Sequence, residues 1–284
     1  MTIYKFSVIS SDGFPYYNLI IKEPSKSLKL YLRFFDFSSE DDQNFNLEHT
    51  NSFDLHAGLV SALFKFARSM DKNIQFLEFS SSKEINKLNK KPSYKGNVLI
   101  TTQTEPYLLH NSIYEKIKII YKSIIAYKIP LNSSMKILPN EEEKIHDILT
   151  DSEAIRRVKK KMDEIKRAGK EFLEDMKIYG LNEICITSFD LSPIIVLGKK
   201  YTLDDVHEIL RNIGNIPEIA PMHWIYRQSH LSNEQIWVHL FKSNVGPSIN
   251  GLFEPYFYLL FCDINSYLGE TPAILGNIFN KILG

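Results

Sequence analysis

Cysteine is scarce in this chain of 284 residues, which has only Cys185 and Cys262. Each stands inside an apolar run, EICIT and YLLFCDI respectively, where we expect a buried and poorly reactive thiol. Two cysteines are too few for the disulfide framework that stabilises many small secreted domains. The cysteine content is therefore typical of a protein from a reducing compartment.

The sequence also shows no excess of charge of one sign, no long apolar run and no leader-peptide pattern in its first residues. Its 34 Lys and Arg balance its 34 Asp and Glu, whereas nucleic-acid-binding proteins usually have a basic excess, so we expect no nucleic-acid partner. The longest apolar run, residues 256–262, is far shorter than the ~18 residues of a membrane-spanning helix. The start, MTIYKFSVISSDG, resembles a strand rather than a signal or transit peptide. We expect a cytoplasmic protein without a transmembrane segment, and peripheral membrane association stays open.

Motifs for catalysis and for cofactor binding are missing as well. The chain has no Gly-x-Ser-x-Gly elbow, no Gly-x-x-x-x-Gly-Lys loop and no Gly-x-Gly-x-x-Gly turn. His207 and Glu208 begin like a metalloprotease helix, but Arg211 stands where that motif needs its second histidine. We therefore expect a protein that is not an enzyme, with no catalytic residues and no cofactor.

The candidates for metal ligation are His223, His230 and His239. His223 and His239 flank Trp224 and Trp237 on neighbouring predicted strands, so the two imidazoles could face each other. Structural metal sites usually contain cysteine or closely spaced histidines, and neither cysteine is near in the sequence. Strand histidines beside tryptophans more often serve in packing, so we expect no metal site.

The most regular pattern in the chain lies in residues 52–70, SFDLHAGLVSALFKFARSM. Its apolar residues recur at spacings of three and four, which predicts one broad apolar face of a helix. A face this broad needs a sheet to cover it. Alternating or continuous apolar residues predict strands at 3–10, 15–22, 28–35, 73–80 and 98–102. An isoleucine-rich stripe from Ile113 to Ile125 predicts a second helix.

The second half begins after a proline-containing linker, residues 128–140. Residues 141–179 are predicted to be helical, with a heptad-like apolar seam that Gly180 ends. The remaining patterns predict strands at 183–189, 193–197, 222–228, 235–242 and 256–263, and helices at 202–213 and 271–283.

A basic run lies within the 141–179 segment and is the candidate interaction surface. A run of this kind can bind phosphate or anionic lipid. Acidic residues three or four positions away supply partners, notably in the pairs Glu153–Arg157 and Asp163–Arg167, so we favour a solvated helix face. The candidate interaction residues are Arg156, Arg157, Lys160, Lys161 and Arg167.

The first half of the chain resembles the longin family. The hairpin IYKFSVISSDGFPYYNLII, the helix FDLHAGLVSALFKFA, the strands NIQFLEF and VLITTQ and the helix IYEKIKIIYKSIIAYK follow the family's order. The sequence departs from a minimal longin domain by an added strand and acidic loop at 28–51, and the 202–213 helix is short for the family. The second half resembles either another longin-like unit or a roadblock-type unit. If the 141–179 helix belongs to it, the order of elements is that of a roadblock unit; if that helix closes the first module, the order is that of a longin domain.

Together, the patterns and the resemblance imply an α/β (α+β) fold of two modules. Each would be a mainly antiparallel five-stranded sheet packed by helices, longin/profilin-like, with a roadblock-like second module as the alternative. We expect a longin-like domain over 1–130, a linker and long amphipathic helix over 131–180, and a second longin-like or roadblock-like domain over 181–284.

The resemblance further implies a non-catalytic adaptor or regulator of the membrane-trafficking type. Its partner would be a small GTPase or another trafficking subunit, and homo- or hetero-oligomerisation stays open. The alternative is a PAS- or GAF-like small-molecule sensor, which would need a closed apolar cavity with a few convergent polar groups. Fold alone does not decide between these functions.

Overall fold

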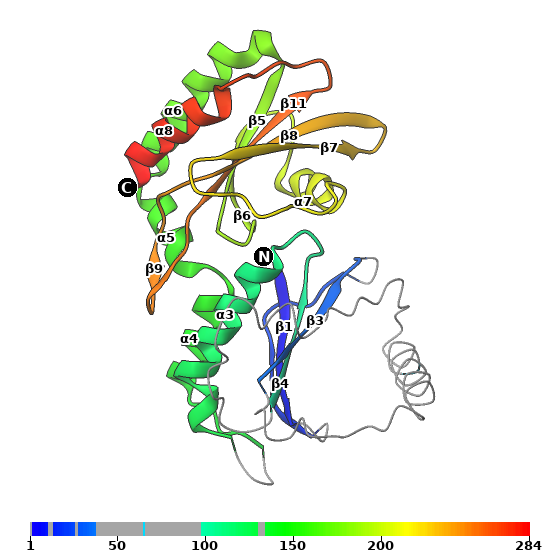
Figure 1. Cartoon of the computed structure of the whole chain (residues 1–284), viewed down its shortest axis with the longest axis vertical. Helices are drawn as coiled ribbons and strands as arrows, with labels where there is room; N and C mark the ends of the chain where they lie inside the picture. The colour runs from blue at the N-terminus through cyan, green and yellow to red at the C-terminus, as the bar shows by residue number, and fades with distance from the viewer. Residues whose placement is uncertain (1, 11–13, 26–27, 38–64, 66–97, 130–133) are drawn as a thin grey trace. The chain divides into compact units, whose positions relative to one another are not determined.

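The computed structural model describes residues 2–10, 14–25, 28–37, 65, 98–129 and 134–284 (Figure 1). Residues 1–36 and 98–284 form one compact unit and residues 37–97 another. The four-stranded and five-stranded sheets of the described residues both belong to the first unit. Of the helix predicted over 52–70, the structure describes Lys65 alone, which is helical and exposed. The strand predicted at 73–80 lies outside the described residues.

The first sheet is antiparallel throughout, with the strand order β2-β1-β4-β3. In β1, Phe6 and Val8 are fully buried on one face, as the alternation of apolar residues predicts. Helix α3 buries its isoleucine stripe, and Figure 1 shows α3 and α4 along the same side of this sheet. The strands are β1 (Ile3–Ser10), β2 (Pro15–Ile20), β3 (Tyr31–Asp36) and β4 (Val98–Thr104), and the helical segments are α3 (His110–Ser123), η2 (Ile125–Tyr127) and α4 (Pro139–Leu149).

The segment predicted as one long amphipathic helix is divided in the structure. It forms α4, α5 (Ser152–Lys160), α6 (Met162–Met176) and the short η3 (Lys177–Tyr179). Asp151 breaks the helix between α4 and α5, because its φ of 55° is left-handed and its carboxylate lies 2.7 Å from the buried Lys116 ammonium. Gly180 ends the segment with a φ of 85°, as the sequence predicts.

The second sheet has five antiparallel strands in the order β6-β5-β11-β8-β7. This confirms the predicted five-stranded sheet in the second half. Its strands are β5 (Leu181–Thr187), β6 (Pro193–Gly198), β7 (Trp224–Leu231), β8 (Glu234–Lys242) and β11 (Phe257–Asp263); a small ribbon is formed by β9 (Ser248–Ile249) and β10 (Leu252–Phe253).

Helices cover both faces of the second sheet (Figure 1). α6 and α8 (Thr271–Leu283) pack together on one face, where Phe172 and Phe279 join a core with Tyr258 of β11. α7 (Leu203–Arg211) lies on the other face, where the Ser229 hydroxyl of β7 donates to the carbonyl of Ile209 at 2.6 Å. Because α6 packs on this sheet, the order from α6 to α8 is helix-strand-strand-helix-strand-strand-strand-helix, leaving aside the small β9–β10 ribbon.

The structure confirms the predicted α+β class with antiparallel sheets packed by helices. The described part of the first sheet has four strands, and the additional strand expected at 73–80 is outside it. The boundaries proposed at residues 130 and 180 stay predictions. Among the helices of the described residues, none combines the length and the apolar character needed to cross a membrane.

Candidate interaction surface

The outer strands β7 and β8 carry four rings, Trp224, Tyr226, Trp237 and His239, which we call the aromatic face. The register pairs Tyr226 with His239, so the alternation of side chains places these rings on the same face of the hairpin. The Tyr226 ring centroid lies 5.4 Å from that of Trp237 and 5.8 Å from that of His239. These rings form one continuous cluster rather than separate surface residues.

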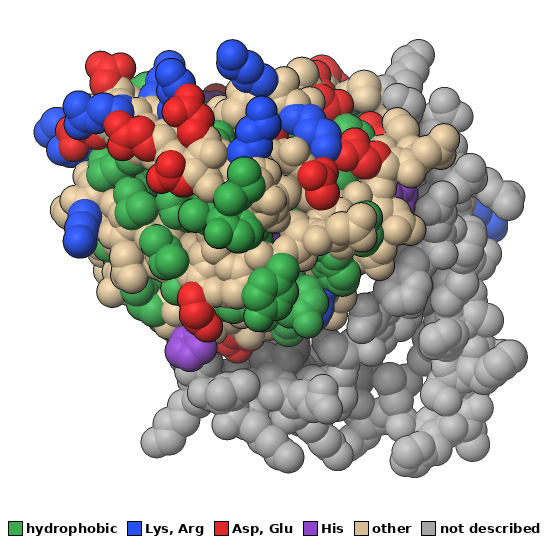
Figure 2. Space-filling model, turned by 90° about the horizontal axis from the view of Figure 1, so that it is seen from above, with side chains coloured by type: hydrophobic (Ala, Val, Ile, Leu, Met, Phe, Trp, Pro, Cys, Tyr) green, Lys and Arg blue, Asp and Glu red, His purple; other side chains and the backbone are tan. Residues whose placement is uncertain are grey.

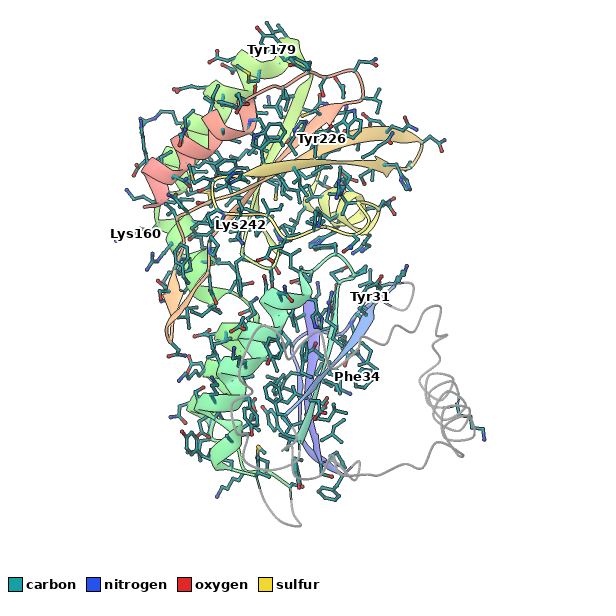
Figure 3. The ribbon with its side chains drawn as sticks, in the orientation of Figure 1. Tyr31, Phe34, Lys160, Tyr179, Tyr226 and Lys242 are labelled. Carbon is teal, nitrogen blue, oxygen red and sulfur yellow. The ribbon has the colours of Figure 1, made fainter. Side chains whose placement is uncertain are left out.

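The aromatic face stays partly open because α8 stops short of it. Trp224 and Trp237 pack against the core that contains Phe279 of α8, so the aromatic face and α8 share one side of the sheet. α8 contacts β8 and β11, whereas Tyr226 on β7 is 54% exposed (Figure 3). Figure 2 shows apolar side chains gathered on the side of the molecule that is uppermost in Figure 1, bordered by charged ones.

The three histidines considered as metal ligands are not brought together. His239 is 9% exposed and packs beside Trp224 with ring centroids 5.7 Å apart, and burial lowers its pKa to about 4. His223 places its Nδ1 at 3.0 Å from the carbonyl of Pro221, and His230 lies exposed near the hairpin turn. His239 is thus a packing residue, as predicted for histidines beside tryptophans. In the part of the chain that the structure describes, no three His, Cys, Asp or Glu residues are placed to hold a metal ion.

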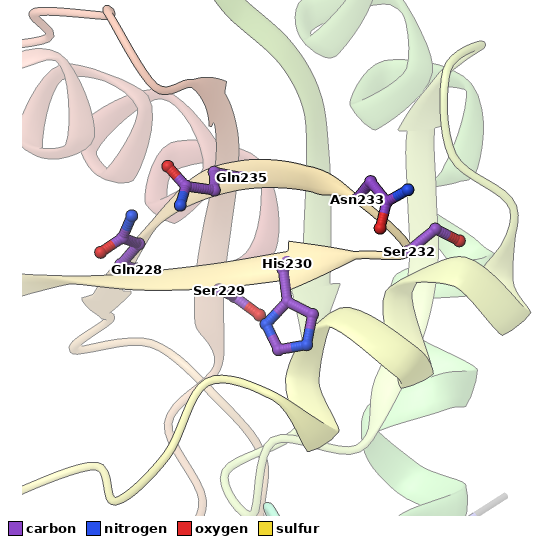
Figure 4. Close-up of a pocket in the computed structure, with 6 residues that line it drawn as sticks. All are labelled: Gln228, Ser229, His230, Ser232, Asn233 and Gln235. Carbon is purple, nitrogen blue, oxygen red and sulfur yellow. The ribbon is translucent and has the colours of Figure 1, made fainter.

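A hollow of about 450 Å³ lies at the turn of the β7–β8 hairpin (Figure 4). The Ser229 hydroxyl that lines it is already bound to the α7 backbone. The lining is polar, unlike the closed apolar cavity that the small-molecule sensor would need. The lining residues are Gln228, Ser229, His230, Ser232, Asn233 and Gln235.

The predicted basic surface is largely a solvated helix face. Glu153 pairs with Arg156 at 2.6 Å and with Arg157 at 3.2 Å, the latter as predicted. Lys161 pairs with Glu164 at 3.0 Å, also within one turn of helix. Exposed pairs of this kind contribute little to stability.

The two remaining basic candidates lie on different helices. Lys160 is exposed on α5 (Figure 3) and Arg167 is exposed on α6. Among the described residues, the predicted ion pair between Asp163 and Arg167 does not form. Both cations therefore stay candidates for contact with a partner.

Both cysteines are buried and free, as the sequence predicts. They lie on adjacent strands of the second sheet, Cys185 on β5 and Cys262 on β11. Burial raises the pKa of both thiols, that of Cys262 to about 12. Neither thiol is therefore suited to act as a nucleophile at neutral pH.

A buried ion cluster joins the first sheet's helix to the second sheet. The Lys116 ammonium on α3 is fully buried and lies 2.5 Å from Asp190 Oδ2 and 2.7 Å from Asp151 Oδ1. Asp190 stands in the turn between β5 and β6, where it also accepts from the Ser188 hydroxyl at 2.7 Å and the Ser192 amide at 2.8 Å. Burial raises the pKa of Asp190, but Lys116 and these hydrogen bonds more than offset it and hold the pKa below its usual value.

A second buried contact lies between β4 and α7. Arg211 donates to both oxygens of Glu105, at 2.8 and 2.9 Å, and the Tyr4 hydroxyl donates to the same carboxylate at 2.6 Å. The Tyr107 hydroxyl lies 2.7 Å from His207 Nδ1. Burial lowers the pKa of His207 to about 4. His207 and Arg211, which the failed metalloprotease motif brought to notice, are therefore structural contacts.

Neither the buried Lys116 cluster nor the Arg211–Glu105 contact was predicted from the sequence. One signal was available for Lys116, because it stands inside the isoleucine stripe of IYEKIKII and so on the buried side of its helix. A lysine there needs a buried acidic partner. The sequence does not indicate that this partner is Asp190, which lies far along the chain.

No protein-family model and no curated protein matches this chain. The longin and roadblock resemblances therefore stay predictions that rest on the order of the elements and on the residue patterns within them.

Proposed function

We propose that this protein is a non-catalytic adaptor or regulator of the membrane-trafficking type, which binds a small GTPase or another trafficking subunit by surface contact. The observation that supports this most directly is the packing of α6 on the second sheet. It gives the second part of the chain the order that the sequence analysis attributes to a roadblock-type unit. In the described part of the first half, β1, β2, β4 and α3 follow one another as in the order on which the longin resemblance rests, with β3 as the added strand.

The aromatic face is the surface we assign to the partner. The centres of protein interfaces are rich in Trp and Tyr and poor in charge, and Trp224, Tyr226 and Trp237 meet that description. β7 also ends the described sheet, so its outer edge can accept an extended segment of a partner. If the protein promotes nucleotide exchange, it would do so by reshaping the partner's switch segments.

A binding assay with one surface substitution tests this function. The full chain is immobilised, and a panel of small GTPases is passed over it. Each GTPase is tested in three states: loaded with GDP, loaded with a GTP analogue, and free of nucleotide. We expect at least one member to bind, and Tyr226→Glu to weaken that binding by at least about tenfold because it places a charge in the apolar contact.

The control is Tyr267→Glu, which changes a ring that is 85% exposed between β11 and α8, outside the aromatic face. We expect this variant to bind as the wild type does. Failure of every GTPase and trafficking subunit to bind the wild type would contradict the proposal.

A further inference from the structure

Glu254, between β10 and β11, is a buried acidic residue. It is 2% exposed, and among the residues that the structure describes neither of its carboxylate oxygens finds a hydrogen-bond partner. Its backbone amide donates to the carbonyl of Pro247 at 2.9 Å, which fixes the residue in the connection. An ionised carboxylate in such a place would be neither solvated nor paired.

The surroundings of Glu254 make ionisation still less favourable. The charged groups that act on it are Asp151 from the α4–α5 turn, Asp190 from the β5–β6 turn and Lys116 from α3. One ammonium therefore faces two other carboxylates, so a third negative charge would give the cluster a net charge of −2 (+1 − 3). Buried charge that no opposite charge compensates is strongly destabilising.

The connection that carries Glu254 is attached to α5, directly after Asp151. The Tyr256 hydroxyl donates to the carbonyl of Ala154 at 3.3 Å, and Arg157 donates to the carbonyl of Gly246 at 3.5 Å. Arg157 is itself paired with Glu153 at 3.2 Å, so it is not free to neutralise Glu254. Repulsion at Glu254 would act on the α4–α5 turn and hence on the Asp151–Lys116 contact.

We propose that Glu254 carries a proton in the folded protein at neutral pH, and that loss of this proton loosens the junction formed by Lys116, Asp151 and Asp190. The junction between the helix of the first sheet and the turn of the second is then sensitive to pH. Acidification tightens it and alkaline conditions weaken it. Such a device would let pH adjust how firmly the two sheets are held together.

The direction of the pH effect follows from where the proton binds. Burial, together with Asp151 and Asp190 and against Lys116, raises the pKa of Glu254 to about 8. Burial and Asp190 likewise raise the pKa of Asp151 to about 7, although Lys116 opposes them. In the unfolded chain both acids ionise near pH 4, so the folded state binds more protons between about pH 4 and pH 8. Stability must therefore fall as the pH rises through this window.

Thermal unfolding of the full chain and of Glu254→Gln tests the proposal. From about pH 6 to pH 8, we expect the wild type's unfolding constant to rise by up to roughly tenfold per pH unit for this one proton, with a falling melting temperature. Gln keeps the shape and removes the charge, so Glu254→Gln should melt higher than the wild type at about pH 9 and show a flatter pH profile. The control Glu218→Gln, at an exposed acid, should follow the wild type. An unchanged pH slope in Glu254→Gln would overturn the proposal.

Infrared difference spectroscopy reads the proton itself. Between about pH 6 and pH 10, the wild type should lose the absorption bands of protonated carboxyl groups, and Glu254→Gln should lose less of this absorption, because only Asp151 of the two acids is then left to titrate. If Glu254→Gln does not fold, the same spectra of wild-type protein with isotope-labelled glutamate test the proposal. A label-shifted band from a protonated glutamate at neutral pH supports the proposal, and the absence of such a band overturns it.

Discussion

At the level of single residues, Lys116 shows how one buried charge determines its surroundings. Burial lowers the pKa of its ammonium, but Asp151 and Asp190 more than offset this, so the pKa lies above its ordinary value and the lysine stays charged. As far as the lysine's own ionisation is concerned, the stabilisation from this pairing is present below the ordinary lysine pKa and is lost as the pH rises through the raised one. The same contact holds Asp151 in its left-handed conformation, which separates α4 from α5.

Substitution Lys116→Met should therefore be severely destabilising. It leaves two buried carboxylates without their cation, and we expect a loss of about 3–5 kcal/mol in the free energy of unfolding, measured by urea denaturation at neutral pH. The matched control is Lys118→Met, because Lys118 is 24% exposed and its ion pair with Glu115 lies on the surface. That change should lower the free energy by about 0–1 kcal/mol. Equal effects of the two substitutions would show that the buried cluster is unimportant.

At the level of helices and strands, most of the described elements could be predicted because each has its own periodicity. The strand at 235–242 and the helix at 271–283 were predicted within one residue of β8 and α8. The break between α4 and α5 could not be predicted, because it depends on a buried lysine contributed by another helix. Local sequence patterns therefore predict helices and strands well, whereas helix breaks that depend on tertiary contacts cannot be predicted from them.

The packing of α8 on the second sheet depends on a close approach at Gly276. A Cβ atom at this position would lie 2.3 Å from the Phe241 ring. Gly276→Val should therefore push α8 away from β8 and lower the free energy of unfolding by about 1–3 kcal/mol in a denaturant titration. Asn277→Ala, at the exposed neighbouring position, is the control and should change it by no more than about 0.5 kcal/mol. A stable Gly276→Val variant would mean that α8 can shift without loss.

At the level of the whole molecule, function depends on surfaces that the sequence specifies only in part. The strand patterns predict Trp224 and Trp237 on neighbouring strands, as the β7–β8 pairing has them. The exposure of Tyr226 cannot be predicted from these patterns, because it depends on how far α8 extends over the sheet. The acid–base contacts between the two sheets were missed for the same reason, since each joins residues far apart in the chain.

The two tryptophans of the chain, Trp224 and Trp237, both belong to the aromatic face. They therefore report on this surface and on no other part of the protein. The most direct measurement is ¹⁹F NMR of the full chain labelled with fluorotryptophan, titrated with a small GTPase or trafficking subunit that it binds, with the resonances assigned through Trp224→Phe. If the aromatic face receives the partner, both resonances shift or broaden until binding saturates. Saturated binding that leaves both resonances unchanged would contradict it.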